Sequence, residues 1–245
     1  MDSLILKPMD SSLLVWRCLH DGPITRVNLD APPDESRLPS RESAVRLLGQ
    51  LTDRYGSAAI LAWEEDEVVG LLRFVPRVVA RMEGCGGFCL LMPHPAGPTE
   101  DFPLAVLPAR ETIEDRTLVV TCMQLLSDRQ RQGLGRAMVE RLKSWARNEG
   151  WDAIEATAYQ DLPLVYEVTG NAGRRWWEDL GFHVTESMEE EAMKYYGDFV
   201  HSLEAQARER EMDPGKVTRK FIMRWDARGL SEEPASESRP DKRSP

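Results

Sequence analysis

The sequence contains little cysteine, and none of its apolar runs is long. Four cysteines in 245 residues are too few for a disulfide framework, so we expect reduced thiols. No apolar stretch reaches about 18 residues, which predicts no transmembrane helix. Asp2, Lys7 and Asp10 interrupt the apolar core that a signal peptide needs. We therefore expect a cytoplasmic protein with no membrane partner.

Positive charge is also scarce. The chain has 31 lysines and arginines against 41 aspartates and glutamates, a net charge of −10. Nucleic-acid binding requires basic surface to neutralise phosphates, so no nucleic-acid partner is expected. Hydrophobic residues make up 42% and charged residues 29%, which is typical of a globular chain.

Several chemical signatures are missing. The chain has no G-x-S-x-G, H-E-x-x-H or C-x-x-C sequence, so hydrolase, zincin and thioredoxin functions have no support. Cys18 with His20, and Cys85 with Cys89 and His94, lack a second ligand pair at standard zinc spacing. We therefore predict no metal site.

The first half of the chain predicts one helix and one hairpin. Apolar residues at helical spacing indicate a helix over residues 41–54. Apolar runs at 58–63 and 68–74 flank a polar turn and predict a β-hairpin. Residues 76–116 hold six prolines and four glycines, and we expect an insertion with a second short hairpin, of which Val78 to Ala80 is one strand, followed by a long loop.

The second half predicts a βαβ unit followed by further alternating elements. Its strands are expected at 117–126 and 151–158, with a helix between them from Leu134 to Asn148. A short apolar patch follows at 162–166. After it, the pattern predicts a helix at 172–180 and a strand that starts at 182. An acidic helix at 189–210 and a last strand at 216–225 complete the domain. We expect one α/β domain over residues 1–226 and a disordered tail over 227–245.

The turn between the first strand and the helix of the βαβ unit carries the most informative motif. It reads Gln130-Arg131-Gln132-Gly133-Leu134-Gly135. Glycines allow a close backbone approach, and the free N–H groups of a helix N-terminus attract anions, so the turn suits a diphosphate. The arginines at 129, 131 and 136 add positive charge. The alternative is an ordinary strand–helix turn in which glycine serves packing only; neither the P-loop nor the G-x-G-x-x-G fingerprint matches.

This turn resembles the Q/R-x-x-G-x-G/A loop of the GCN5-related N-acetyltransferases, through Gln130, Gly133 and Gly135. The family's downstream Y-E-x-L-G-F segment is similar to residues 177–182, which read W-E-D-L-G-F. The resemblance covers roughly residues 40–75 and 117–225. It implies an α/β fold with a mixed, mostly antiparallel sheet, splayed at the cofactor strand and flanked by helices.

The resemblance also implies acetyl-CoA as cosubstrate, held between the splayed parallel strands. The backbone near Leu125 and Leu126 would pair with the pantetheine arm, and Asn171 lies near the family's pantetheine-contacting asparagine. The pyrophosphate would take N–H groups from the loop, which are those of Arg131, Gln132, Gly133, Leu134, Gly135 and Arg136. The implied reaction is direct attack of a primary amine on the thioester.

The sequence departs from the family at the general acid, because Trp177 replaces the tyrosine and an indole N–H is a very poor acid. Tyr159 and Tyr166 are the candidate phenols, with packing as the alternative role for both. Glu155 is the candidate base, because a carboxylate in an apolar strand is costly to bury without a partner. A surface-facing Glu155 and a base made only of water remain open.

Three hypotheses follow for function. The first is acetyl transfer to a primary amine, the second an acyl-CoA-binding sensor or interaction module without turnover, and the third an α/β domain that binds no CoA. Residues 186–213 contain nine acids and three bases, a net charge of −6. This negative charge favours a cationic acceptor; the alternative is that the segment is a helix whose charged face is solvated. The apolar face of that helix must pack either on the sheet of its own chain or on a second subunit, so a homodimer is one of two alternatives.

Overall fold

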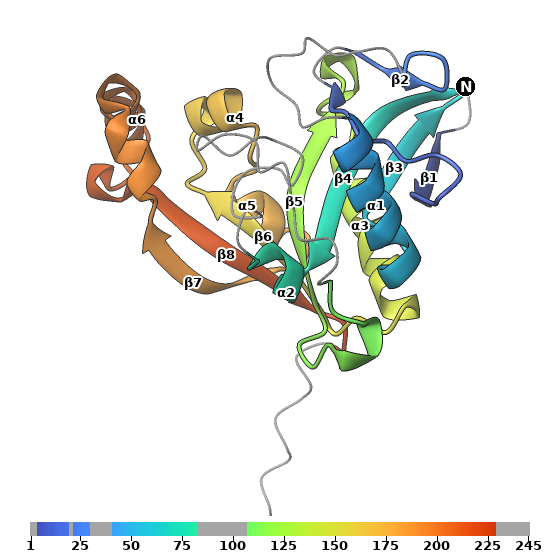
Figure 1. The fold of residues 1–245 in the computed structure, drawn as a ribbon. Coiled ribbons are helices and arrows are strands. Elements are labelled where there is room, and N and C mark those ends of the chain that lie inside the picture. The colour runs from blue at the N-terminus through green and yellow to red at the C-terminus, as the bar shows by residue number, and fades with distance from the viewer. Residues whose placement is uncertain (1–3, 20–21, 30–40, 83–106, 229–245) are drawn as a thin grey trace, which may run out of the picture.

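A mixed sheet forms the centre of the molecule (Figure 1). The computed structural model describes residues 4–19, 22–29, 41–82 and 107–228. The strands follow the order β1-β3-β4-β5-β6-β8-β7, with β2 paired to β4 outside this path. Their bounds are β1 Ile5–Pro8, β2 Ile24–Thr25, β3 Ala59–Glu64, β4 Glu67–Pro76, β5 Thr117–Leu125, β6 Ala153–Tyr159, β7 His183–Glu189 and β8 Arg219–Asp226. Among these strands of the described residues, β5 and β6 are the one parallel pair of neighbours.

Helices cover both faces of the sheet. The α-helices are α1 Arg41–Tyr55, α2 Arg77–Ala80, α3 Leu134–Asn148, α4 Pro163–Thr169, α5 Arg174–Glu178 and α6 Gly197–Glu209. In Figure 1, α1 and α2 lie on the face toward the viewer and α3 lies behind the sheet. Met138, Val139 and Leu142 are buried because their spacing of three and four residues places them on one face of α3. The predicted helix at 41–54, the β3–β4 hairpin and the βαβ unit are confirmed.

The parallel pair separates soon after it forms. It has three residue pairs, Thr117 with Ala153, Leu118 with Ile154 and Val119 with Glu155. Beyond this point β5 continues to Leu125 and β6 to Tyr159 without pairing to each other. The two arms of the sheet diverge upward in Figure 1. This opening between the strands is the splay that the family resemblance implies.

A second apolar core lies beyond the end of β6. It joins α4, α6 and the 3₁₀ helices Glu191–Tyr195 and Pro214–Lys216, which together we call the α4–α6 unit. Its buried members are Tyr159, Leu162, Val165, Met193, Leu203, Ala207 and Val217. The acidic helix α6 therefore packs its apolar face on this chain.

The N-terminal segment is held on the sheet by one buried cation. The Arg73 guanidinium donates to the carbonyl oxygens of Val15, Trp16 and Arg17 at 2.8–3.2 Å. Farther along, the Leu19 N–H donates to Gln124 Oε1 on β5. The segment thus lies against the same strand that borders the opening.

Several predicted elements are wrong. Val78 to Ala80 belong to helix α2, because Arg77 and its neighbours turn away from β4 instead of continuing it. No element was predicted for the apolar patch at 162–166, whose residues 163–166 lie in α4, which begins at Pro163. Pairing of Glu189 with Arg219 keeps the start of the predicted 189–210 helix in β7, so α6 begins only at Gly197.

Some expectations lie outside the described residues. These include the second strand of the short hairpin, most of the long loop before Pro108, and residues 229–245 of the expected tail. Strands β1 and β2 were not predicted, because their short mixed sequences carry no alternation. In the part of the chain that the structure describes, no helix has both the length and the apolar character needed to span a bilayer.

Candidate functional site

The turn after β5 has the backbone conformation of an anion-binding loop. A 3₁₀ helix, Ser127–Arg129, leads into it, and α3 begins at Leu134. Arg131 and Gly133 have φ of 59° and 83°, in the left-handed region. Only glycine adopts that region without strain, which is a reason for glycine at 133. The left-handed backbone conformation of Arg131 and Gly133 turns successive N–H groups to one side of the chain.

The N–H groups of this loop are unpaired within the described chain. No backbone N–H from Arg131 to Arg136 donates to an acceptor there, and Gly133 supplies no side-chain cap. Because α3 contributes the partial positive charge of its N-terminus at the same place, a negative group would be stabilised. This is the arrangement that the sequence motif predicts.

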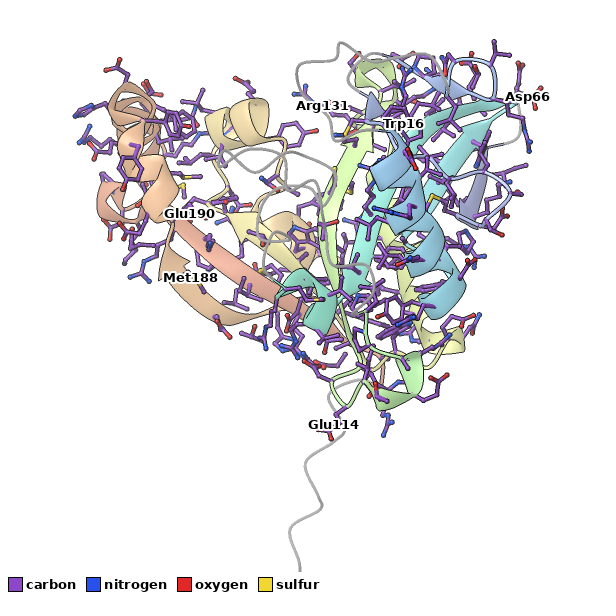
Figure 2. All side chains as sticks on the ribbon, in the orientation of Figure 1. Trp16, Asp66, Glu114, Arg131, Met188 and Glu190 are labelled. Atoms are coloured by element: carbon purple, nitrogen blue, oxygen red, sulfur yellow. The ribbon has the colours of Figure 1, made fainter. Side chains whose placement is uncertain are left out.

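The three arginines near the loop differ in their partners. Arg129 forms ion pairs with Glu64 and Asp128 at 2.8 and 2.7 Å, which neutralise its charge. Arg136 donates to the Asp179 carbonyl oxygen. Among the described residues Arg131 has no ion-pair partner, and its exposed side chain lies beyond the tip of β5 (Figure 2). Arg131 is therefore the cation most available to a bound phosphate.

The free edge of β5 faces the opening. The Leu126 N–H donates to the Val69 carbonyl oxygen on β4. Because peptide groups alternate along a strand, those of Leu125 and Met123 point away from β4, toward the opening. Of the two predicted positions, Leu125 is thus oriented for pairing, whereas the N–H of Leu126 is used within the sheet. Met123 was not predicted, although strand alternation from Leu125 could have found it.

A bulge interrupts β5 near the root of the opening. Arg73 pairs with Cys122 and Phe74 with Val120, so Thr121 is an extra residue on β5. A bulge bends the strand and re-aims the peptide groups around it. It therefore contributes to the divergence of β5 from β6.

The two adjacent tryptophans of α5 have different environments. Trp177, at the family's tyrosine position, is 3% exposed and packs against Phe182 with ring centroids 4.9 Å apart. Trp176 instead lies beside Gly135, in the first turn of α3, where the side chains of Leu125 and Met123 also converge. Side chains of consecutive helical residues point about 100° apart, so the Trp176 ring points away from the side on which the Trp177 ring is buried. Trp176 is a wall of the opening that sequence reasoning missed.

The candidate phenols lie in different places. The Tyr166 hydroxyl donates to Gln130 Oε1 at 3.3 Å, which brings α4 to the loop. The Tyr159 hydroxyl donates instead to Glu190 Oε2, which also accepts from Lys220 Nζ. Burial raises the pKa of Tyr159, and the negative Glu190 raises it further, so Tyr159 is a weaker acid than an ordinary tyrosine.

The segment between α4 and α5 lies on the β6 side of the opening. Gly173 forms a parallel bridge with Tyr159 at the end of β6, and Asn171 is half-buried just before it. The Asp161 carboxylate accepts the N–H of Arg175 at 3.1 Å, and burial raises the pKa of Asp161. Asn171 therefore lies in the segment that adjoins the end of β6.

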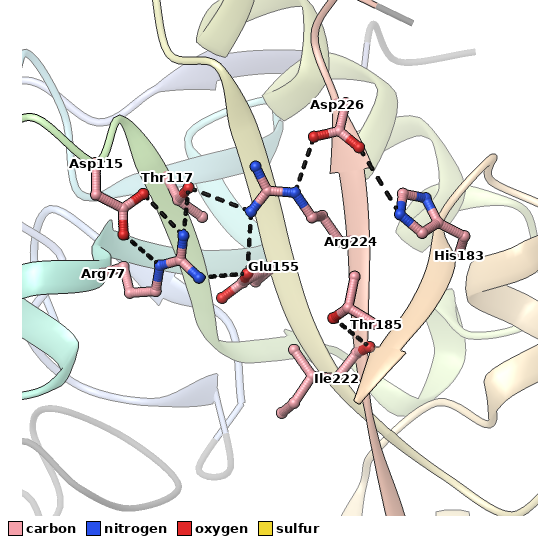
Figure 3. Close-up of polar contacts among 9 residues, drawn as sticks. All are labelled: Arg77, Asp115, Thr117, Glu155, His183, Thr185, Ile222, Arg224 and Asp226. Carbon is pink, nitrogen blue, oxygen red and sulfur yellow. Dashed lines mark hydrogen bonds and ion pairs between the residues drawn. The ribbon is translucent and has the colours of Figure 1, made fainter. Parts of the chain in front are cut away.

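Glu155 sits at the root of the opening in an ion-pair network (Figure 3). Its Oε1 accepts from Arg77 at 2.8 Å and from Arg224 at 3.1 Å. Arg77 also binds Asp115 through two nitrogens, and Arg224 binds Asp226 at 2.8 Å. Two guanidinium groups thus share one carboxylate oxygen of Glu155 as ion-pair partners. Glu155 is therefore part of an ion-pair network that joins neighbouring elements. It does not lie at the loop of residues 130–136.

The metal-ligand candidates are not assembled in the described chain. Within it, no three histidine, cysteine or acidic side chains form a group suited to a metal ion. His20, Cys85, Cys89 and His94 lie outside the described residues. Cys18 is buried beside Arg73, and Cys122 lies in β5.

Replacing Glu155 with glutamine should destabilise the protein. The variant leaves two guanidinium groups close together without their shared anion, so we expect the free energy of unfolding to fall by about 3 kcal/mol. Urea denaturation measures it. Glu114→Gln is the control, because Glu114 is exposed at the molecule's surface (Figure 2), and should change stability by less than about 0.5 kcal/mol. Equal effects of the two variants would contradict the role of the network.

Asp115 should make stability depend on pH in the acid range. Hydrogen bonds from Arg77 lower the pKa of Asp115 below its ordinary value. The stabilisation is therefore complete above the unfolded pKa of about 3.9 and disappears as the pH falls through the lower folded pKa. Asp115→Asn should cost at most about 1 kcal/mol at neutral pH, and nothing once Asp115 is protonated. Denaturation across this pH range measures it; a constant difference would contradict the assignment.

Comparison with known proteins agrees with this geometry. The family model described as the acetyltransferase (GNAT) family matches residues 27–165. That range includes the splayed strands and the whole loop. No curated protein gives a significant match.

The chain is also similar, at low sequence identity, to several solved structures. YncA of Salmonella typhimurium, solved with its cofactor acetyl-CoA, is 15% identical, with 95% of this chain and 99% of that chain covered and a TM-score of 0.46. The ribosomal-protein-S18-alanine N-acetyltransferase of Escherichia coli is 10% identical, with 92% and 94% covered and a TM-score of 0.43. A GNAT family acetyltransferase of Elizabethkingia anophelis with acetyl-CoA bound is 12% identical, with 92% and 99% covered and a TM-score of 0.39. Since the family model spans more than half of the sequence, the chain belongs to the GNAT acetyltransferase family.

Proposed function

We propose that the protein is an acetyl-CoA-dependent N-acetyltransferase that modifies a primary amine. The observation that carries the proposal is the combination of an opening between two parallel strands and a loop of unpaired N–H groups at its mouth. Family membership agrees with it. The acceptor is an amine whose identity the described residues do not encode.

The residues around the opening fit the parts of acetyl-CoA. The N–H groups of residues 131–136 and the Arg131 guanidinium suit the pyrophosphate. The peptide groups of Leu125 and Met123 suit the pantetheine amides, as an added strand would be paired. Trp176 supplies an apolar wall next to Gly135.

Acetyl-CoA, when bound, supplies an activated thioester: a neutral amine forms a bond to the acetyl carbon, the carbon–sulfur bond breaks, and CoA leaves as a thiolate that takes a proton from solvent. A backbone N–H of β5 near the Thr121 bulge would polarise the reacting carbonyl, because the bulge leaves peptide groups there outside the pairing with β4. We propose that water takes the proton of the ammonium, because Glu155 is held by two arginines and Tyr159 by Glu190. Glu155 and Tyr159 then act by holding the strands and the α4–α6 unit in place.

A second candidate function is binding of acyl-CoA without turnover. Burial of Trp177 supports it, since the family's tyrosine position neither carries a phenol nor faces the opening. The two candidates predict the same cofactor site and differ only in product formation.

Calorimetry with acetyl-CoA on the native protein and on Gly135→Glu tests the site. A Cβ at Gly135 would meet Leu125, Trp176 and Met123 at 3.5–3.7 Å, which is ordinary contact. Gly135→Ala should therefore bind within about threefold of the native protein, whereas the anionic glutamate should weaken binding by about 100-fold or more.

Absence of binding by the native protein to both acetyl-CoA and free CoA would contradict the proposal. Where binding is found, incubation with a panel of primary amines, followed by mass spectrometry, distinguishes the two candidates. Acetylated product supports the enzyme, and binding without product from any amine supports the sensor.

A further inference from the structure

One hydrogen bond joins the two sides of the opening at its mouth. Gln130 follows β5, and Tyr166 lies on α4, which follows β6. These strands no longer pair beyond Val119 and Glu155. The bond from the Tyr166 hydroxyl to Gln130 Oε1, 3.3 Å long, is therefore a contact between two chain segments that the sheet itself does not hold together.

The position of Tyr166 is decided by the α4–α6 unit. Leu162 and Val165 are almost fully buried in its apolar core. The Leu164 N–H donates to Gln206 Oε1 of α6 at 3.2 Å, which fixes the first turn of α4. Tyr166 itself is 39% exposed and is not part of that core, so it projects from a supported helix toward the loop.

Gln130 uses both ends of its amide. Its oxygen accepts from Tyr166, and its Nε2 donates to the Leu125 carbonyl oxygen at 3.4 Å. A carboxamide has a fixed donor and a fixed acceptor end, and the Leu125 carbonyl oxygen can only accept, so it selects the orientation in which the nitrogen faces β5 and the oxygen is left for the Tyr166 hydroxyl. The first residue of the loop is thereby tied to both walls of the opening.

We propose that Tyr166 is a positioning residue that acts through Gln130 to preorganise the loop for acetyl-CoA. This rests on the proposed function. Holding Gln130 restricts the conformations of residues 130–136 before the diphosphate arrives, which lowers the entropy that binding must remove. The competing role for Tyr166 is that of the acid that protonates the leaving thiolate, which would act on the chemical step.

Amide nitrogen relaxation, measured by NMR on the protein without ligand, tests the positioning directly. Tyr166→Phe removes only the hydroxyl, and we expect lower order parameters for the amides of residues 130–136, as in Gln130→Ala. The matched control is Tyr195→Phe, because Tyr195 is 88% exposed on the same unit and should leave the loop unchanged. Loop order parameters in Tyr166→Phe equal to those of the native protein would overturn the inference, whatever the outcome with acetyl-CoA.

A double-mutant cycle on acetyl-CoA affinity tests whether Tyr166 acts through Gln130. The loss of one neutral hydrogen bond should raise the dissociation constant by about 2- to 10-fold in each single variant. If the two residues act together, the double variant is no weaker than Gln130→Ala alone, and additive losses would overturn the inference. The thermal midpoints of all variants should stay close to that of the native protein, which separates this effect from unfolding.

Kinetics distinguish positioning from acid catalysis once an acceptor is known. Tyr166→Phe should raise the KM for acetyl-CoA, change kcat less than about twofold and keep the alkaline limb of the pH profile. A large loss of kcat with loss of that limb would identify Tyr166 as the acid and overturn the inference. Failure of the native protein to bind acetyl-CoA would contradict the proposed function, while the relaxation experiment would still decide whether Tyr166 orders the loop.

Discussion

The early end of the pairing between β5 and β6 is the constraint on which the site depends. Two parallel neighbours that pair over three residue pairs and then diverge leave peptide groups without a strand partner. In a closed sheet these groups would be satisfied by the next strand, and no extended ligand could enter. The opening therefore exists because the sheet is incomplete there, and the loop of N–H groups lies at its mouth because that loop directly follows β5.

Such an opening requires that its root be held firmly. Glu155 forms the last parallel pair with Val119, and its carboxylate receives guanidinium groups from α2 and from β8. The network thus ties three neighbouring elements at the point where the strands separate. A carboxylate at this position is explained by the need to hold two cations.

The α4–α6 unit extends the fold on the other side of the opening. Its apolar core packs over the end of β6, and Tyr159 is held there by Glu190. Through Tyr166 the unit also reaches the loop that follows β5. The long segment between β7 and β8 is thereby linked to the proposed cofactor site, although it is remote from the loop in sequence.

The sequence by itself determined the βαβ unit, the glycine-containing loop and the family, because these depend on local periodicity and on glycine at a left-handed position. Only the tertiary structure decided the roles of the individual side chains. Glu155 and the two tyrosines look alike in the sequence as catalytic candidates, yet Arg77, Arg224, Glu190 and Gln130, which come from distant segments, determine what each one does. Trp176 and Trp177 are likewise neighbours in the sequence, but Trp177 is buried in the core whereas Trp176 is only partly buried against it. Local propensity sets the elements, whereas ion pairing and burial between elements far apart in the chain set the chemistry, and a sequence pattern contains no record of those contacts.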